Sequence, residues 1–179
     1  MPGRHVYYQL NSYLAHNQQS RQQYQVQPEV VWDIREPSDN ARGATTGRRI
    51  SSRVRQQFAT NPPCADFRIA CGIFPSKSWY IEIHKRSGVT VGDVLDGLYS
   101  GLRHRISKTE WTYMAHTTQS RVAEAFYDRQ RRSKDPRYEH QAGLRRIDYM
   151  LRSSSFVGLS PSPEYPNTWM LTTRRINRH

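Results

Sequence analysis

The stretch "RSGVTVGDVLDGLYSGLRHRI", residues 86–106, predicts one amphipathic helix from which the rest of the fold can be worked out. Thr90 and Asp93 have the spacing of a capping box, in which each side chain bonds the other residue's backbone N–H. Acidic residues near the start and basic residues at the end suit the helix dipole. The apolar positions recur every three or four residues and form one stripe: Val91, Val94, Leu95, Leu98 and Leu102.

Two glycines interrupt this helix. Gly97 and Gly101 stand one turn apart beside the apolar stripe. Each costs about 1 kcal/mol relative to alanine inside a helix. A neighbouring strand or helix that packs very close to them would explain their presence, so we expect a tightly packed face here.

The segments around the helix alternate between apolar and polar residues, which is typical of half-buried strands. "DFRIACGIFP" and "SWYIEIHKRSG", residues 66–75 and 78–88, suggest a hairpin through "FPSKS". "EVVWDIREP", residues 29–37, has the same period and ends at a proline. Towards the C-terminus, "SFVGLSPS" and "NTWMLTTRR" are expected as strands around the turn "PSPEYP".

A second helix is expected after a second capping box, "SKTE", residues 107–110, with an interruption near Thr117. Residues 143–151, "GLRRIDYML", fit a helix or a strand equally well. Together these elements predict an α+β fold, in which an antiparallel sheet of about four to five strands packs against two main helices.

The chain of 179 residues is expected to form a single α+β domain over 29–176. Residues 1–28 form a Gln/Tyr-rich segment that is typical of a flexible arm, residues 38–63 an Arg-rich loop expected to be mobile and exposed, and residues 177–179 a basic tail. Alternatively, the arm docks through its larger apolar residues, which are Val6, Tyr7, Leu10, Tyr13 and Leu14.

Several of these segments, taken together, match a known pattern. They are "WDIREP", "YIEIHKRSGVTVGDVLDGLYSGL", "RVAEAFYDR", "GLRRIDYML" and "FVGL", followed by a late tryptophan. The pattern resembles an uncharacterised domain family that is abundant in mushroom-forming fungi and their relatives, and it extends from about Val30 to Leu171. The resemblance implies a fungal, intracellular α+β protein. It implies no activity, cofactor or catalytic residue.

The charge balance favours an anionic partner. Lys and Arg number 27 against 15 Asp and Glu, a formal net charge of +12, and nearly all of the cations are arginines. Such a charge favours nucleic acid, an acidic protein or an anionic lipid surface, although it also serves solubility. The first hypothesis is therefore a non-enzymatic binding or scaffolding module.

The candidate anion-binding residues fall into two groups. Those near the helix ends could gather on one side, interleaved with tyrosines, or form a solvated face partly neutralised by acids: Arg103, Arg105, Arg129, Arg131, Arg132, Arg137, Arg145 and Arg146, with Tyr127, Tyr138 and Tyr149. Those in the Arg-rich loop could contact a partner directly: Arg48, Arg49, Arg53 and Arg55. Within that loop, "RRIS" places two arginines before Ser51, which resembles the consensus of basophilic kinases. An alternative function is thus a protein–protein module regulated by phosphorylation at Ser51.

A second alternative is a metal-dependent hydrolase that uses Asp33, Glu82 and His84. All three lie on polar faces of expected strands, where they could instead pair with Arg35, Arg68 or Lys85 in solvent. The sequence has no phosphate-binding glycine loop and no nucleophile-elbow motif. We expect no cofactor or metal, and the sequence favours a binding protein over an enzyme.

The remaining features concern the compartment. Cys64 and Cys71 are expected to be reduced thiols. The N-terminus has no apolar region of the secretory type, and no stretch approaches the roughly 18 apolar residues of a membrane helix. The sequence therefore predicts an intracellular protein, cytoplasmic or nuclear, and leaves the oligomeric state open.

Overall fold

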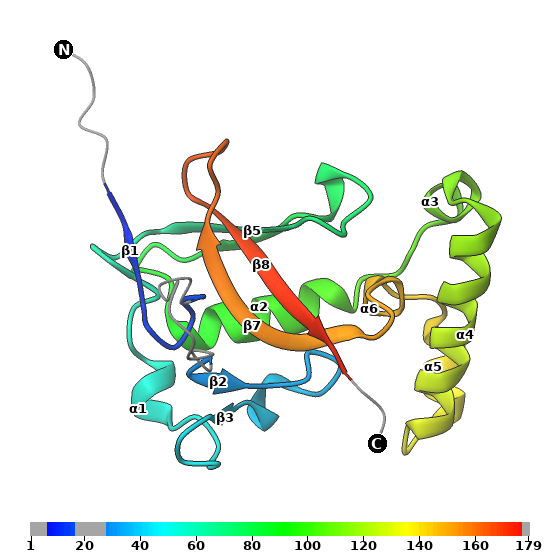
Figure 1. Ribbon diagram of the computed structural model, residues 1–179, viewed down its shortest axis with the longest axis horizontal. Helices are drawn as coiled ribbons and strands as arrows, with labels where there is room; N and C mark the ends of the chain where they lie inside the picture. Colours follow the sequence, from blue (N-terminus) through cyan, green and yellow to red (C-terminus); the bar gives the residue numbers. More distant parts are fainter. Residues whose placement is uncertain (1–6, 17–27, 177–179) are drawn as a thin grey trace, which may run out of the picture.

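The computed structural model describes residues 7–16 and 28–176, and a four-stranded sheet lies at its centre (Figure 1). The strand order is β6-β5-β8-β7. The strands are β5 (Asp66–Cys71), β6 (Ile81–His84), β7 (Ser153–Pro161) and β8 (Thr168–Arg175). The predicted α+β class is confirmed.

The sheet consists of two antiparallel hairpins, β5–β6 and β7–β8, as the alternating segments predicted. A short 3-10 helix, η2 (Lys77–Trp79), lies in the first connection. The hairpins join through β5 and β8, which are parallel, with Ile69 opposite Trp169. The sheet is therefore mixed, because a long helical connection brings the second hairpin back beside the first.

The quoted stretch forms α2 (Val91–Leu102), with both bonds of the capping box in place. The five residues of its apolar stripe are at most 1 % exposed. A Cβ on Gly97 would lie 2.6 Å from Ile83 Cδ1, and one on Gly101 would lie 2.6 Å from Ile81 Cγ1. The predicted tight face is confirmed, and the close neighbour is β6.

The second predicted helix is divided and lies at one end of the sheet (Figure 1). It consists of α3 (Lys108–Tyr113) and α4 (His116–Arg132), separated at Met114 close to the predicted interruption. Two further helices follow, α5 (Pro136–Ala142) and α6 (Arg146–Tyr149), so the undecided segment 143–151 contains a short helix. Whereas α2 packs on the sheet, α4 packs mainly against α5 and α6. A second small core joins these helices to the sheet through Trp79, Ile106 and Val122.

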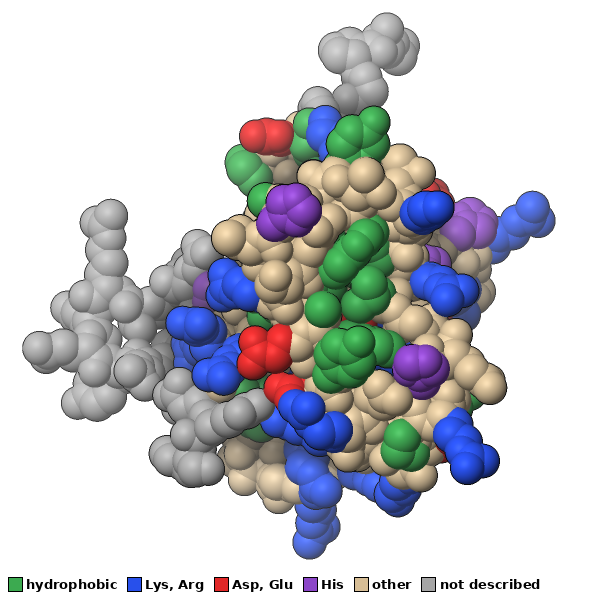
Figure 2. Space-filling view, turned by 90° about the vertical axis from the view of Figure 1, so that its right-hand side faces the viewer, with side chains coloured by type: hydrophobic (Ala, Val, Ile, Leu, Met, Phe, Trp, Pro, Cys, Tyr) green, Lys and Arg blue, Asp and Glu red, His purple; other side chains and the backbone are tan. Residues whose placement is uncertain are grey.

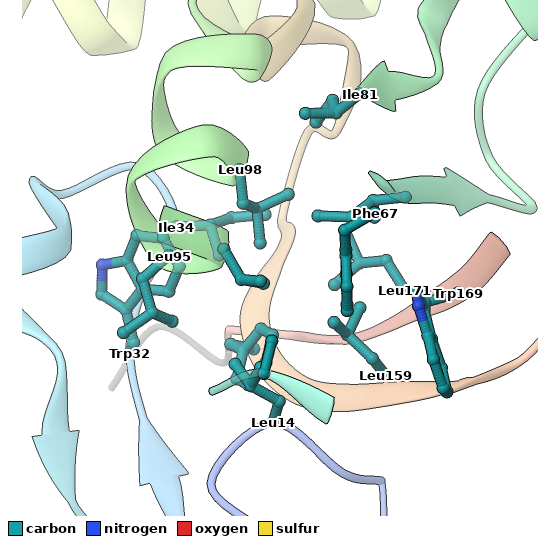
Figure 3. Close-up of a cluster of buried hydrophobic side chains, with 14 of the residues drawn as sticks. Leu14, Trp32, Ile34, Phe67, Ile81, Leu95, Leu98, Leu159, Trp169 and Leu171 are labelled. Atoms are coloured by element: carbon teal, nitrogen blue, oxygen red, sulfur yellow. The ribbon is translucent and has the colours of Figure 1, made fainter. Parts of the chain in front are cut away.

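The main core collects side chains from α2, from all four sheet strands and from the segment 29–37 (Figure 3). In that segment Val30, Trp32 and Ile34 are buried while Val31 is exposed, as the alternation predicted. Regular pairing is shorter than expected, because only β2 (Val30–Val31) pairs with β3 (Arg42–Gly43).

The Arg-rich loop 38–63 contains short regular elements and a few buried residues. It contains η1 (Ser38–Asn40), β3, α1 (Ser52–Arg55) and β4 (Thr60–Asn61). Ala41 and Ala59 are buried, and the Arg55 guanidinium pairs with Asp96 of α2. These small anchors are not evident from a composition dominated by arginine and polar residues.

Part of the predicted flexible arm is packed as well. In residues 7–16, β1 (Gln9–Leu10) pairs with β4, and Leu14 is fully buried. This corresponds to the docking alternative. The rest of the arm, 1–6 and 17–27, and the tail 177–179 lie outside the described residues. Within the described part, no helix has the length and apolarity needed to cross a bilayer.

Candidate functional site

The three candidate catalytic residues lie at opposite edges of the sheet. Asp33 bridges to Ser155 on the outer edge of β7, whereas Glu82 and His84 are on β6 at the other edge. Three strands separate them, so at about 4.8 Å per strand the carboxylates are on the order of 15–20 Å apart. They cannot act on one substrate atom, and the proposed hydrolase site is not formed.

Each of these residues has a local partner instead. Arg35 Nη2 lies 2.6 Å from Asp33 Oδ2, and Arg68 Nη2 lies 2.8 Å from Glu82 Oε1. These are the solvent-facing pairs that the sequence offered as the alternative to catalysis. His84 Nδ1 lies 2.6 Å from Asp66 Oδ1 across the hairpin. In residues 7–16 and 28–176, no group of three or more His, Cys, Asp and Glu side chains could hold a metal ion.

Two of the candidate anion-binding arginines belong to an internal charge network. Arg129 of α4 pairs with Glu139 of α5 and, through Nε at 2.7 Å, with Asp148 of α6. Arg145 pairs with the same glutamate at 3.1 Å. The Asp148 side chain is only 2 % exposed. These arginines are already occupied by carboxylates and hold three helices together.

The side chains of this network also form hydrogen bonds with backbone groups. Arg129 Nη2 donates to the carbonyl of Gly143, and the Asp148 carboxylate accepts from the backbone N–H of Arg145. Burial alone would lower the pKa of the Arg129 guanidinium, but the nearby carboxylates of Asp148 and Glu139 raise it above its ordinary value. Removing one member would leave a buried charge without its partner.

Two more candidates are packed against aromatic rings. The Arg103 guanidinium lies 3.9 Å from the Tyr99 ring centroid and donates to the Arg35 carbonyl. The Arg146 guanidinium lies 5.1 Å from the ring of Trp79 and donates to the Ser78 carbonyl. Both residues are half-buried, so only part of each guanidinium is available to a ligand at the surface.

What remains is an exposed basic surface carried by α3, α4, α5 and the residues flanking them, which we call the helical face. It exposes seven cations, namely Arg105, Lys108, Arg121, Arg131, Arg132, Lys134 and Arg137, against two exposed acids, Glu124 and Asp135. Arg131 is also paired with Asp128. Figure 2 shows this end of the molecule, with basic side chains surrounding a central apolar group.

Three exposed tyrosines accompany these cations, one on each helix. Tyr113 of α3 is 86 % exposed, Tyr127 of α4 is 53 % exposed and Tyr138 of α5 is 59 % exposed. The sequence had singled out Tyr127 and Tyr138 but not Tyr113, which ends a short helix just before its break. Tyr149, the third predicted tyrosine, is instead half-buried with its ring edge-on to Trp79.

Two surface pockets lie on the described surface, and the first borders the helical face at Tyr113. One of about 400 Å³ lies between η2 and α3, over Trp79 and Tyr149. Its carboxylate, Glu110, accepts from Trp79 Nε1 and from the Ser107 backbone N–H, both at 2.7 Å. Burial acts to raise the pKa of Glu110, but these hydrogen bonds lower it. The carboxylate is thus committed to capping α3.

The other pocket, of about 370 Å³, lies beside α1. Its lining includes Arg48, Arg49 and Ser51, which belong to the Arg-rich loop 38–63. The Ser51 hydroxyl accepts from the backbone N–H of Val54 and so caps α1. Arg48 and Arg53 are exposed, and Ser51 is accessible. However, the backbone around Arg48 is bonded to Gly43, so a kinase would have to open this segment to bind it in an extended form.

Comparison with known proteins places this fold in a group without assigning it a reaction. No curated protein and no solved structure matches the chain. A family model described as "Family of unknown function (DUF6699)" matches residues 30–167. That range contains α2, all of the helical face and three of the four strands of the central sheet, and it ends one residue before β8 begins. The chain therefore belongs to the family of unknown function DUF6699.

Proposed function

We propose that this protein is a non-enzymatic binding module and that its helical face binds single-stranded nucleic acid. The observation that carries the proposal is the combination of three exposed tyrosines with seven exposed cations on that face. Arginines and lysines neutralise phosphates, while tyrosine rings stack on unpaired bases. An acidic protein surface would use the cations but offer no bases to the rings.

The helices beneath this face support the proposal because their spacing is fixed. Tyr127 and Tyr138 stand on different helices, which the Arg129–Glu139–Asp148 network joins. Two stacking platforms at a constant separation need little ordering when a ligand binds, which favours affinity.

The test is fluorescence anisotropy with a labelled 16-nucleotide single strand at 50 and 200 mM salt. If about four phosphates are neutralised, affinity should fall about fiftyfold between these concentrations, from a slope of about −0.7 per phosphate. Arg131→Glu with Arg132→Glu should abolish binding, and Tyr127→Ala should weaken it at least about fivefold.

A matched control is Arg48→Glu with Arg49→Glu, which makes the same charge change beside α1, at the other end of the sheet (Figure 1). That variant should bind as the parent does. Absence of binding at 50 mM salt, or an equal loss in both double variants, would refute the proposal. Binding to phosphatidylserine vesicles but not to the oligonucleotide would assign the face to a lipid instead. A cytoplasmic or nuclear location belongs to this proposal and can be checked by microscopy of a tagged chain.

A further inference from the structure

A second feature, unrelated to the helical face, is the way residues 7–16 occupy a groove of the domain. We call residues 7–16, the described part of the predicted Gln/Tyr-rich segment, the arm. The arm lies outside the family match, which begins at residue 30. Its one fully buried side chain, Leu14, enters the main core beside α2 and β7 (Figure 3). The domain thus encloses a leucine that comes from a separate piece of chain.

The arm is held at two strand edges by backbone hydrogen bonds. At its start, Gln9 and Leu10 pair antiparallel with β4, and the Asn11 N–H donates to the Ala59 carbonyl at 2.8 Å. At its end, the Leu159 N–H donates to the Leu14 carbonyl, and the His16 N–H donates to the Leu159 carbonyl, both at 2.7 Å. Addition of an extended segment to open sheet edges is a common mode of peptide recognition.

The groove also selects particular side chains. Asn11 Nδ2 donates to the Phe58 carbonyl and to Gln57 Oε1, both at 3.1 Å, while its Oδ1 accepts from the Tyr13 N–H. Three residues later Leu14 provides the apolar anchor. By contrast, Tyr7 is 85 % exposed. Between Asn11 and Leu14, Ser12 is exposed and bonds Glu29 at 3.1 Å, and Tyr13 is only partly buried, so the pattern that we take from the contacts is asparagine at the first position and leucine at the fourth.

The floor of the groove is shaped for a passing backbone. Gly158, within the family match, has φ +145°, and a Cβ there would lie 2.6 Å from His16 N and 2.7 Å from His16 Cα. Any larger residue would collide with the arm's main chain. The glycine in "FVGL" is thus required twice, by its positive φ at the register shift of the β7–β8 pairing and by the close passage of the arm.

We propose that this groove is a peptide-binding site that the chain's own arm occupies, and that its external ligand is an extended peptide carrying Asn-x-x-Leu. Without the arm, β4 and the Leu159 edge would expose unpaired backbone groups and an open apolar hole, a state that proteins avoid. The groove therefore needs a bound peptide segment, and the contacts of Asn11 and Leu14 indicate which side chains that peptide should carry. A tethered arm acts at an effective concentration in the millimolar range, so it shields the groove until it is released.

The experiment uses the full chain with a specific protease site inserted between residues 17 and 27, cleaved after folding. A labelled peptide of residues 7–16 is then added to cut and uncut protein. The cut protein should bind it and the uncut protein should bind it at least about thirtyfold more weakly. A Leu14→Ala peptide should lose at least about thirtyfold in affinity, as expected for truncating a buried leucine. A Tyr7→Ala peptide is the matched control and should bind like the parent.

Hydrogen exchange on the uncut chain gives a second, independent readout. Arm amides such as those of Asn11 and His16 should exchange faster than those of β5 and β8, because the arm opens locally. Exchange of both sets at one rate, unfolding on cleavage, or equal binding of the Leu14→Ala peptide would show that the arm is an inseparable part of the core and overturn the proposal. Concentration-dependent dimers that Leu14→Ala abolishes would assign the groove to a second copy's arm instead.

Discussion

The contact between α2 and β6 allows a sharp test, the substitution Gly101→Ala. In an isolated helix this change should stabilise by about 1 kcal/mol. Here the new Cβ would lie 2.6, 2.8 and 3.0 Å from three side-chain carbons of Ile81, which is 6 % exposed. Overpacking of this kind costs about 1–3 kcal/mol, and three crowded atoms place this site in the upper half of that range. The net expectation is a loss of about 1–2 kcal/mol.

The assay is urea unfolding followed by circular dichroism. With an m-value of about 2 kcal/mol/M, the midpoint should fall by about 0.5–1 M while m stays constant. Ser100→Ala, an exposed change in the adjacent position of α2, is the control and should leave the midpoint equal or slightly higher.

A double-mutant cycle with Ile81→Ala identifies the cause. Ile81→Ala alone should cost about 2–4 kcal/mol through the cavity it leaves. In the double variant the added methyl has room, so the combined loss should be smaller than the sum by at least about 1 kcal/mol. If Gly101→Ala raised the midpoint, or if the two losses simply added, the close approach of α2 to β6 would be refuted.

Three other substitutions or conditions test the remaining structural claims. Asp148→Asn should cost about 3–5 kcal/mol in urea unfolding because it removes the more deeply buried of the two carboxylates that pair with Arg129, whereas Glu82→Gln, in an exposed pair, should change stability by less than about 1 kcal/mol. Ser51→Ala should cost about 1 kcal/mol through loss of the α1 cap, and a neutral result would contradict that bond. Burial raises the pKa of Asp93, but hydrogen bonds from Lys85 and Thr90 lower it below its ordinary value, and Glu110 is likewise lowered. The stability that they provide is present above pH of about 4 and is lost as pH falls through their folded pKa values; Asp93→Asn should flatten this acid limb of the thermal midpoint.

The elements that could be predicted from the sequence are those whose signals are local. Thr90 and Asp93 cap α2 three residues apart, and the hairpin strands are joined by short turns. The Gly97–Gly101 spacing even indicated a close neighbour. The parallel pairing of β5 with β8 could not be predicted, because about a hundred residues separate Ile69 from Trp169 and no local pattern records which strand returns beside which.

The arginines were harder to sort than the strands. Charge counting treats Arg129, Arg131 and Arg132 alike, although the first is internal and the other two are exposed. The partners of Arg129 lie 10 and 19 residues further along, so pairing depends on how α4, α5 and α6 fold together. The only local signal was the Arg145–Asp148 spacing, which closes a helix cap.

Composition also obscured the arm and the loop. Averaged over 1–28 or 38–63, glutamines and arginines dominate, yet single buried residues such as Leu14 and Ala59 determine where each segment lies. One anchor together with backbone pairing is enough to dock a short segment, and neither shows in a compositional average. The sequence shows a glycine at Gly158, but only the structure shows that it has φ +145° and that the arm's main chain passes against it.

The two proposed sites are separable, and this follows from how the fold is assembled. The arm groove is formed by β4 and β7 with the main core beneath it, whereas the helical face rests on the second core and the charge network at the other end of the sheet (Figure 1). Substitutions that disturb Leu14 should therefore leave oligonucleotide binding intact, and those at Arg131 and Arg132 should leave peptide exchange intact. If both activities were lost together in both sets of variants, a global loss of folding would explain the results better than either site.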